Sequence, residues 1–252
     1  MRSTRVWGWL LLLALLALWQ VSAMAWVRST NWPPLTEVGR ALADGLRDGE
    51  LPRVFASTLW RMAVGFVLGA AAGVALGLVM GTMRRVDAAL RPLVELLRPI
   101  PIPAVIPPLI LLLGIDHAMK VFVVAFATFF PVLVNTIGGV RAVDATVLDV
   151  ARTLHVGRVR TLLRVVLPAA APYILAGLRI SLALALIVSV VAEMIAGSEG
   201  IGFHIMAMQY AMRGADMYAA IIGLAAVGYA LNRAMLAVER RLLHWWQRDG
   251  GT

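Results

Sequence analysis

The sequence predicts an all-α integral membrane protein with six transmembrane helices, and three observations support this fold class. Hydrophobic residues make up 61% of the 252 residues, and the mean hydropathy of +0.83 lies far above that of soluble proteins. Apolar runs recur along the chain at about the 20-residue length that a helix needs to cross a bilayer. Arginines cluster at the ends of alternate runs, as in membrane helices with a fixed orientation.

The six expected spans cover residues 6–27, 55–83, 96–113, 121–140, 172–197 and 218–238. An even number of spans places both termini on one side, together with the arginine-rich segments 2–5, 84–91, 141–164 and 233–248. Cytoplasmic loops carry the excess of Arg and Lys, so this side is the expected cytoplasm. The opposite side keeps cations that are mostly mixed with acids: Arg28, Arg40, Arg47, Lys120 and Arg213.

The first apolar run has two interpretations. Ala23-Met24-Ala25 resembles a signal-peptide cleavage site, which would make the run a cleaved segment. We favour a retained span, because the run is longer than a usual signal core and carries tryptophans near its ends: Trp7, Trp9, Trp19 and Trp26. Trp245 and Trp246 are expected to anchor the last span in the same way. We expect one transmembrane domain over residues 1–252, with the first span and an external segment in 1–53 and the core in 54–252.

Glycines recur every four residues in the second span, at Gly65, Gly69, Gly73, Gly77 and Gly81. This spacing places them on one helix face, where the backbone of another helix can approach closely. The contact is either static packing or a moving contact beside a transport pathway, and static packing is the more common use of such a stripe.

Three features inside the spans are candidates for a pathway or gate. Pro101 and Pro103 belong either to an irregular segment that lines a pathway or to an extended lead-in before a helix that starts near Val105. Asn135 is either a polar contact between helices or a pathway residue. Glu193 is either a gate or substrate-facing carboxylate, or a group in the external headgroup zone.

Residues 141–168 form the longest polar interruption in the second half of the chain and hold Arg141, Arg152, Arg158, Arg160 and Arg164. Apolar residues keep helical spacing on two faces: Val143, Val147, Val150 and Leu154 on the first, and Val159, Leu162, Leu163 and Val166 on the second. Gly157 is expected to separate two short helices, and Pro168 to end the second. Two amphipathic helices with a basic polar face indicate a docking element.

Several kinds of chemistry have no matching pattern in the sequence. It contains no P-loop, nucleophile elbow or H-E-x-x-H motif, no cysteine and no histidine pair with metal-ligand spacing, so we expect no catalytic residue and no metal site. The net charge of +9 is explained by membrane orientation rather than by nucleic acid. A secondary transporter or channel would need buried charges, which the spans nearly lack. A membrane-embedded enzyme would have only Glu193, His204 and Asp216 as candidate groups.

The 141–168 segment resembles the EAA loop of the permease subunits of ATP-binding-cassette (ABC) importers. That loop reads E-A-A, three residues, G, nine residues, I, one residue and L-P. In this chain the matching positions are Asp149-Val150-Ala151, His155, Val165 and Leu167-Pro168. Asp for Glu keeps the charge, whereas His for Gly loses backbone freedom, and Gly157 is then the expected source of a turn two residues later.

Two further segments resemble one branch of these importers, which contains nitrate, taurine, aliphatic sulfonate and bicarbonate permeases. The first is Leu97-Arg98-Pro99-Ile100-Pro101 followed by Ala104, Pro108-Leu109 and Gly114-Ile115, and the second is Phe129-Phe130-Pro131 followed by Asn135-Thr136 and Gly139. The resemblance implies a type I ABC importer permease with a cytoplasmic coupling-helix loop between spans 4 and 5. It also implies a bacterial plasma (inner) membrane location, with both termini cytoplasmic.

The same resemblance implies the partners. These are two copies of a cytoplasmic ATPase subunit that carry ATP and Mg²⁺, a periplasmic or extracellular substrate-binding protein, and a second permease copy in a homodimer. The chain itself would bind no cofactor and would not be an enzyme. The docking residues would be Asp149, Ala151, Arg152, Thr153 and Leu154, with His155 and Gly157 at the end of the helix and Leu167 and Pro168 joining it to the fifth span. The implied cargo is a small anion, with organic sulfonates such as taurine or an alkanesulfonate first and nitrate, bicarbonate or a pyrimidine vitamin precursor as alternatives.

Overall fold

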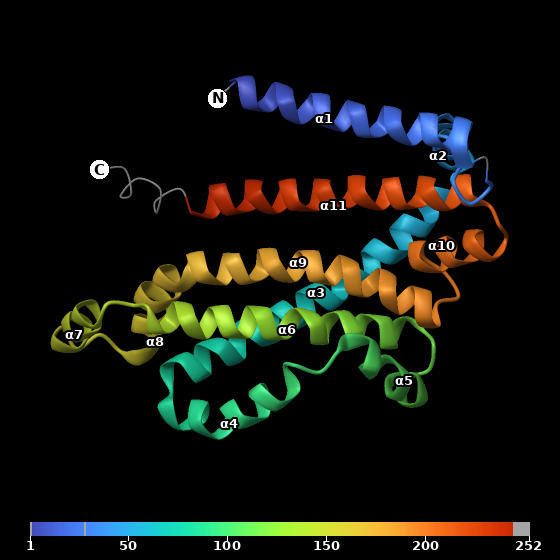
Figure 1. Ribbon diagram of the computed structural model, residues 1–252. Coiled ribbons are helices and arrows are strands. Elements are labelled where there is room, and N and C mark those ends of the chain that lie inside the picture. Colours follow the sequence, from blue (N-terminus) through green and yellow to red (C-terminus); the bar gives the residue numbers. More distant parts are fainter. Residues whose placement is uncertain (1, 28, 244–252) are drawn as a thin grey trace. The chain divides into compact units, whose positions relative to one another are not determined.

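The computed structural model describes residues 2–27 and 29–243, which are helical apart from turns and one isolated β-bridge between Ser29 and Trp32 (Figure 1). The elements are α1 (Arg2–Val21), the π-helix η1 (Ser22–Val27), α2 (Leu35–Arg47), α3 (Glu50–Thr82), α4 (Arg84–Leu97), α5 (Ile102–Leu113), α6 (His117–Arg141), α7 (Ala145–Thr153), α8 (Arg158–Thr161), the π-helix η2 (Leu162–Val166), α9 (Leu167–Ala196), α10 (Ile201–Tyr210) and α11 (Gly214–Leu242). The predicted all-α class is confirmed. Arg28, Trp245 and Trp246 lie outside the described residues.

Five helical segments are long and apolar enough to cross a membrane: Leu10–Val27, Glu50–Thr82, His117–Arg141, Arg158–Ala196 and Gly214–Leu242. The third predicted span differs from these. Helix α5 has 12 residues and a length of about 18 Å, which is shorter than the hydrocarbon core of about 30 Å. It follows α4 across a short break at which the chain bends by 96°, and the bent pair counted as one crossing gives the sixth span.

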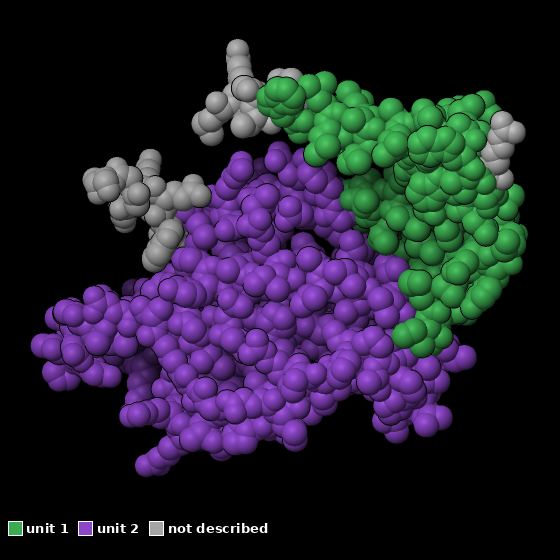
Figure 2. All heavy atoms as spheres, viewed as in Figure 1, with its two compact units in different colours: residues 1–58, 193–227 green, residues 59–192, 228–252 purple. Residues whose placement is uncertain are grey.

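The chain separates into two compact units, which are coloured in Figure 2. Unit 1 comprises residues 1–58 and 193–227, and unit 2 comprises residues 59–192 and 228–252. Helices α3, α9 and α11 each contribute residues to both units.

Unit 1 contains an aromatic cluster. The ring of Trp19 lies 5.4 Å from that of Trp32 and 5.5 Å from that of Tyr218, measured between centroids. Both tryptophans donate a hydrogen bond from the indole N–H group: Trp19 to the Pro33 carbonyl (3.1 Å) and Trp32 to the Ser22 hydroxyl (3.0 Å). Trp19 is therefore partly buried in this unit, and its place at a membrane interface stays a prediction.

In unit 2, α3 and α6 pack along the glycine stripe, and the register shows that they run parallel. A Cβ at Gly65 would lie 2.7 Å from the Val121 carbonyl oxygen, and one at Gly81 would lie 2.7 Å from the Val140 Cβ. The glycines between them face Ala125, Phe129 and Thr136 in the same order. Because both helices begin at the same end, the chain between them must return along their length. Helices α4 and α5 make this return (Figure 1).

The 141–168 loop is fixed to unit 2 by its inner side chains. A buried cluster of Val140, Val166, Ala170 and Ile174 is covered by partly buried side chains from α3, α9 and the loop, including Val143 and Leu148. Val143 was expected on the same face as Val147, Val150 and Leu154, but it packs inward against this cluster. The loop is therefore packed against the ends of α6 and α9, and we call this packed part, at Val140–Val143 and Val166, the loop root.

The prediction that Pro168 ends a helix is wrong. Helical structure continues from Arg158 through η2 into α9, which runs to Ala196. A proline ring inside an α-helix clashes with the carbonyl four residues before it, which is that of Arg164 here. The π-helical turn at Leu162–Val166 widens the helix at this position and accommodates the ring.

Candidate functional site

Helix α7 in the loop between α6 and α9 is capped at its N-terminus by the residue before it. The Asp144 carboxylate accepts a hydrogen bond of 2.8 Å from the backbone N–H of Thr146, as an N-cap residue does. This hydrogen bond holds the pKa of the Asp144 carboxyl below its ordinary value. Further along the exposed face, Asp149 accepts from the Arg152 guanidinium at 2.7 Å.

The end of α7 is a Schellman motif with a histidine in the glycine position. His155 has φ of +52°. Its N–H donates to the Arg152 carbonyl, and the N–H of Val156 donates to the Ala151 carbonyl, both at 2.9 Å. His155 thus supplies the left-handed turn itself. The expectation that Gly157 would supply it is wrong, because Gly157 has φ of −59° and forms the N-cap of α8.

The loop exposes a set of apolar side chains, which we call the outer loop surface. Its members and their exposed fractions are Val147 (46%), Val150 (53%), Leu154 (70%), Val159 (71%) and Leu163 (56%). Arg152, Arg158, Arg160 and Arg164 are exposed around it, and a hollow of about 690 Å³ lies along residues 157–164. Ala151 points the other way and is buried. An apolar centre with a basic rim is typical of a protein–protein interface.

The outer loop surface is joined to α9 without an interruption in helical structure. Val166 is buried and Leu167 is partly buried in the cluster at the loop root, whereas Pro168 is exposed. A displacement of α8 would therefore be transmitted to α9 as motion of one continuous helix.

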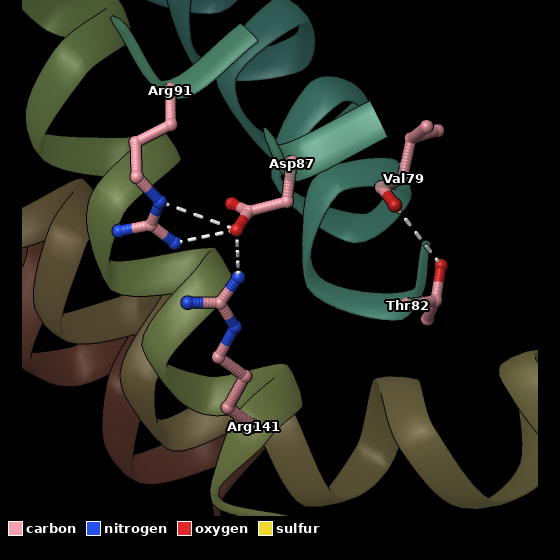
Figure 3. Close-up of polar contacts among 5 residues, drawn as sticks. All are labelled: Val79, Thr82, Asp87, Arg91 and Arg141. Atoms are coloured by element: carbon pink, nitrogen blue, oxygen red, sulfur yellow. Dashed lines mark hydrogen bonds and ion pairs between the residues drawn. The ribbon is translucent and has the colours of Figure 1, made fainter. Parts of the chain in front are cut away.

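A cluster of charged side chains ties α4 to the root of this loop (Figure 3). The Asp87 Oδ2 atom accepts from Arg91 Nη2 at 2.6 Å and Nε at 3.2 Å, and from Arg141 Nη2 at 2.7 Å. The Asp87 side chain is only 11% exposed, and its Oδ1 atom has no hydrogen-bond partner in the described part of the chain. The i,i+4 spacing of Asp87 and Arg91 is visible in the sequence, but the pairing with Arg141 required the fold.

Asn135 faces a second feature of unit 2, a cavity of about 310 Å³. The cavity is lined by the α4–α5 break and by the middle parts of α6 and α9. The Asn135 amide donates to the Pro131 carbonyl at 2.8 Å. Pro101 is the N-cap of α5 and Pro103 lies in its first turn, so the helix begins at Ile102 and not near Val105. Neither proline lines the cavity.

Glu193 lies in unit 1, where its carboxylate is buried. It accepts hydrogen bonds from the Thr58 hydroxyl (2.8 Å) and from the Gly202 N–H (3.0 Å) in the first turn of α10. Gly200, with φ of +104°, passes so close to this carboxylate that a Cβ there would overlap it. In this arrangement Glu193 caps α10, and its role as a gate stays a prediction.

Sequence reasoning missed two buried cations. Arg61 in α3 is fully buried, with Nη1 lying 3.3 Å from the His117 Nδ1 atom. Lys120 is 1% exposed although it was placed between two predicted spans. Together with Glu193, these side chains correct the expectation that the spans nearly lack buried charges. A single arginine in a long apolar run barely lowers the window hydropathy, so Arg61 gave little signal.

The long apolar helices define a multi-pass helical membrane protein. The chain belongs to the family of binding-protein-dependent transport system inner membrane components, whose sequence model matches residues 65–244. This confirms the resemblance to ABC importer permeases. Members of this class work with an ATPase and a substrate-binding protein.

Curated relatives cover most of the chain. The protein named "Putative aliphatic sulfonates transport permease protein SsuC" of Bacillus subtilis (strain 168) is 36% identical over 94% of this chain and 87% of its own length. The taurine transport system permease protein TauC of Escherichia coli (strain K12) is 30% identical over 90% of this chain and 84% of its own. The bicarbonate transport system permease protein CmpB of Synechococcus elongatus is 35% identical over 79% of this chain and 72% of its own.

Solved structures share the fold at low sequence identity. An inward-facing form of the MetNI methionine ABC transporter matches with a TM-score of 0.64 at 18% identity, covering 76% of this chain and 95% of that chain. An amino acid ABC transporter crystallised with histidines also gives 0.64 at 18% identity, covering 79% and 97%. These matches confirm the permease fold.

Proposed function

We propose that this chain is the permease of an ATP-driven importer for a small organic anion, with taurine or an alkanesulfonate as the first candidates. Support comes from the relatives whose names specify aliphatic sulfonates and taurine, at 36% and 30% identity. Bicarbonate, nitrate and a pyrimidine vitamin precursor are alternatives within the same class. The relative named for bicarbonate transport, at 35% identity, keeps that cargo open.

The single observation that carries the coupling role is the outer loop surface. Five large apolar side chains exposed in water would be unfavourable, and a groove on an ATPase subunit would bury them. The residues that would contact that groove are Asp149, Arg152, Thr153 and Leu154. Ala151, on the opposite face of α7, would pack this helix against the rest of unit 2. His155 and Gly157 would set the direction of α8, and Leu167 and Pro168 would carry motion into α9.

The complex would contain two copies of this chain and two ATPase subunits in a bacterial plasma membrane. The loop and both termini would face the cytoplasm, and a binding protein would deliver the anion from the other side. ATP and Mg²⁺ would be held by the ATPase subunits, since this sequence has no P-loop. Closure of the ATPase pair would pull the outer loop surfaces and shift the pathway between two states. Both compact units would serve this one transport domain over residues 1–252.

The substitution Asp149→Lys tests the coupling role. It replaces the acceptor of Arg152 with a cation on an already basic surface, so ATPase co-purification and ATP-dependent uptake should both fall by roughly tenfold or more. Glu37→Lys is the matched control, because it makes the same charge change on an exposed residue of α2. Normal ATPase binding and uptake in the Asp149→Lys protein would contradict the assignment.

A further inference from the structure

The break between α4 and α5 opens onto the 310 Å³ cavity in unit 2. Its lining on α6 extends from Phe126 to Asn135, inside a helix that runs from His117 to Arg141, and its lining on α9 includes Ile180 and Leu184. The cavity therefore lies at the middle of these membrane helices and not at either end. Discontinuous helices near the bilayer midplane are a recurrent setting for transported solutes.

Arg98 is the only charged side chain that lines the cavity within the described part of the chain. It is the C-cap residue that follows α4, its side chain is exposed to the cavity and the surface of the chain, and it has no carboxylate partner among the residues that the structure describes. A cation near the middle of a membrane protein is costly unless an anion compensates it. An anion that enters the cavity would supply this compensation.

The remaining walls of the cavity divide into one polar group and an apolar surface. Asn135 contributes a side-chain amide, of which one N–H already donates to Pro131. The apolar surface includes Ile180, Leu184 and the rings of Phe126 and Phe130, whose centroids lie 5.1 Å apart. This combination suits a ligand with one anionic head and a short apolar chain.

We propose that this cavity is a transient binding site for the translocated anion, in which Arg98 contacts the head group and the apolar wall contacts an aliphatic chain. The planar guanidinium presents paired N–H donors that match two oxygens of a sulfonate. A volume of 310 Å³ lies at the lower end of the range for small-molecule sites. Nitrate and bicarbonate have no chain to occupy the apolar wall, so the cavity selects for alkanesulfonates. The inference rests on the proposed function and deepens it.

The position of Arg98 also connects the site to the coupling loop. The first turn of α4 is held by Asp87 to Arg141 at the loop root, and Arg98 ends the same helix. A shift of the loop root would be carried along α4 to the guanidinium. The affinity of the cavity would then differ between the two states of the transporter.

Uptake by the full complex in proteoliposomes provides the first test, with butane-1-sulfonate and nitrate as probes. Arg98→Gln should lower the maximal rate of butane-1-sulfonate uptake by roughly tenfold or more at saturating binding protein. Arg98→Lys, which keeps the charge but not the paired donors, should retain an intermediate rate. Arg85→Gln is the matched control, since it removes one exposed arginine from the other end of α4 and should leave the rate unchanged.

A second test reads the electrostatics of the cavity without transport. The chain has no cysteine, so Ile180→Cys places one thiol in the cavity wall. The anionic reagent sulfonatoethyl methanethiosulfonate should modify it faster than the cationic trimethylammonioethyl reagent, by roughly tenfold relative to a model thiol. Arg98→Gln should lower this preference, with the neighbouring Arg179 still present, and Arg85→Gln should preserve it.

The outcomes separate this inference from the proposed function. If the wild-type complex shows no ATP-dependent uptake of either probe, nor of taurine or bicarbonate, the proposed function fails and this inference fails with it. If the wild type takes up nitrate but not butane-1-sulfonate, the apolar selectivity is refuted. If wild-type uptake is normal and Arg98→Gln matches Arg85→Gln in both tests, only the Arg98 site is overturned. An Ile180→Cys protein whose thiol reacts with neither reagent overturns it as well.

Discussion

The glycine seam between α3 and α6 allows one substitution to be predicted with opposite signs at two sites. At Gly73, a Cβ would lie 2.8 Å from the Phe129 carbonyl oxygen and 3.0 Å from the Val132 Cβ. At Gly138, on α6, nothing lies within 4 Å of the added atom. Both glycines are inside helices, so the conformational benefit of alanine is the same at both, about 0.5–1 kcal/mol.

The cost at Gly73 follows from the contact distances. Carbon atoms pack best at about 3.5–4.0 Å, so α3 and α6 would have to separate by roughly 0.5–1 Å. A separation of that size loses a quarter to a half of the dispersion energy of each atom contact between α3 and α6. Overpacking of this kind typically costs about 1–3 kcal/mol of folding stability. After subtraction of the alanine benefit, Gly73→Ala should destabilise by up to about 2.5 kcal/mol. Gly138→Ala should stabilise by about 0.5–1 kcal/mol.

Thermal unfolding in detergent, followed by tryptophan fluorescence at one heating rate, measures the difference. The two variants differ by the overpacking cost alone, so Gly138→Ala should melt above Gly73→Ala by roughly 2–12 °C for a chain of this size. Adding Val132→Ala to Gly73→Ala removes the Cγ1 contact at 3.1 Å but keeps the contacts with the Val132 Cβ position and the Phe129 carbonyl, so it should recover little of the loss. The packing argument is refuted if Gly73→Ala melts at or above Gly138→Ala.

Three further predictions concern α7 and its root. Asp87→Asn should destabilise the folded chain by about 2 kcal/mol, and Arg141→Gln by less because Arg91 still pairs with Asp87 in that variant. A double-mutant cycle of thermal stabilities should give a coupling of about 1 kcal/mol between Asp87 and Arg141. His155→Gly should slow hydrogen exchange of the α7 amides and His155→Val should speed it, since the left-handed turn costs a non-glycine residue about 1–2 kcal/mol. The pKa of the Asp144 carboxyl is lower in the folded chain than its ordinary value, so the cap stabilises α7 at neutral pH and is lost as the carboxyl becomes protonated. Protection of the α7 amides from exchange, corrected for the intrinsic rate, should therefore fall below about pH 4, and Asp144→Asn should remove this dependence.

Periodic features of the fold could be predicted from the sequence. The apolar runs at bilayer length gave five spans that the structure confirms, and the four-residue period of the glycines marked a close helix contact. The helices within residues 141–168 could also be predicted, because helical spacing of the valines and leucines persists between two spans. These signals are local, so a single sequence contains them in full.

Contacts between distant segments could not be predicted in the same way. The pairing of Asp87 with Arg141 joins residues far apart in the chain, and only the parallel packing of α3 on α6 brings them together. Arg61 and His117 meet for the same reason. The prediction at Pro168 was wrong because proline usually ends a helix, whereas a π-helical turn lets this helix continue.

The prolines of the third span mark the place of the cavity, although their own side chains do not line it. Parallel packing of α3 and α6 forces α4 and α5 to return along the whole seam, with one end held at Asp87 and the other packed on α6. Pro99 and Pro101 lack N–H donors and interrupt the helix within this return. The space at the break is then lined by their neighbours Arg98, Ile100 and Ile102, and not by Pro101 or Pro103. The prolines thus act through the backbone, by creating the break that brings the Arg98 side chain to the cavity.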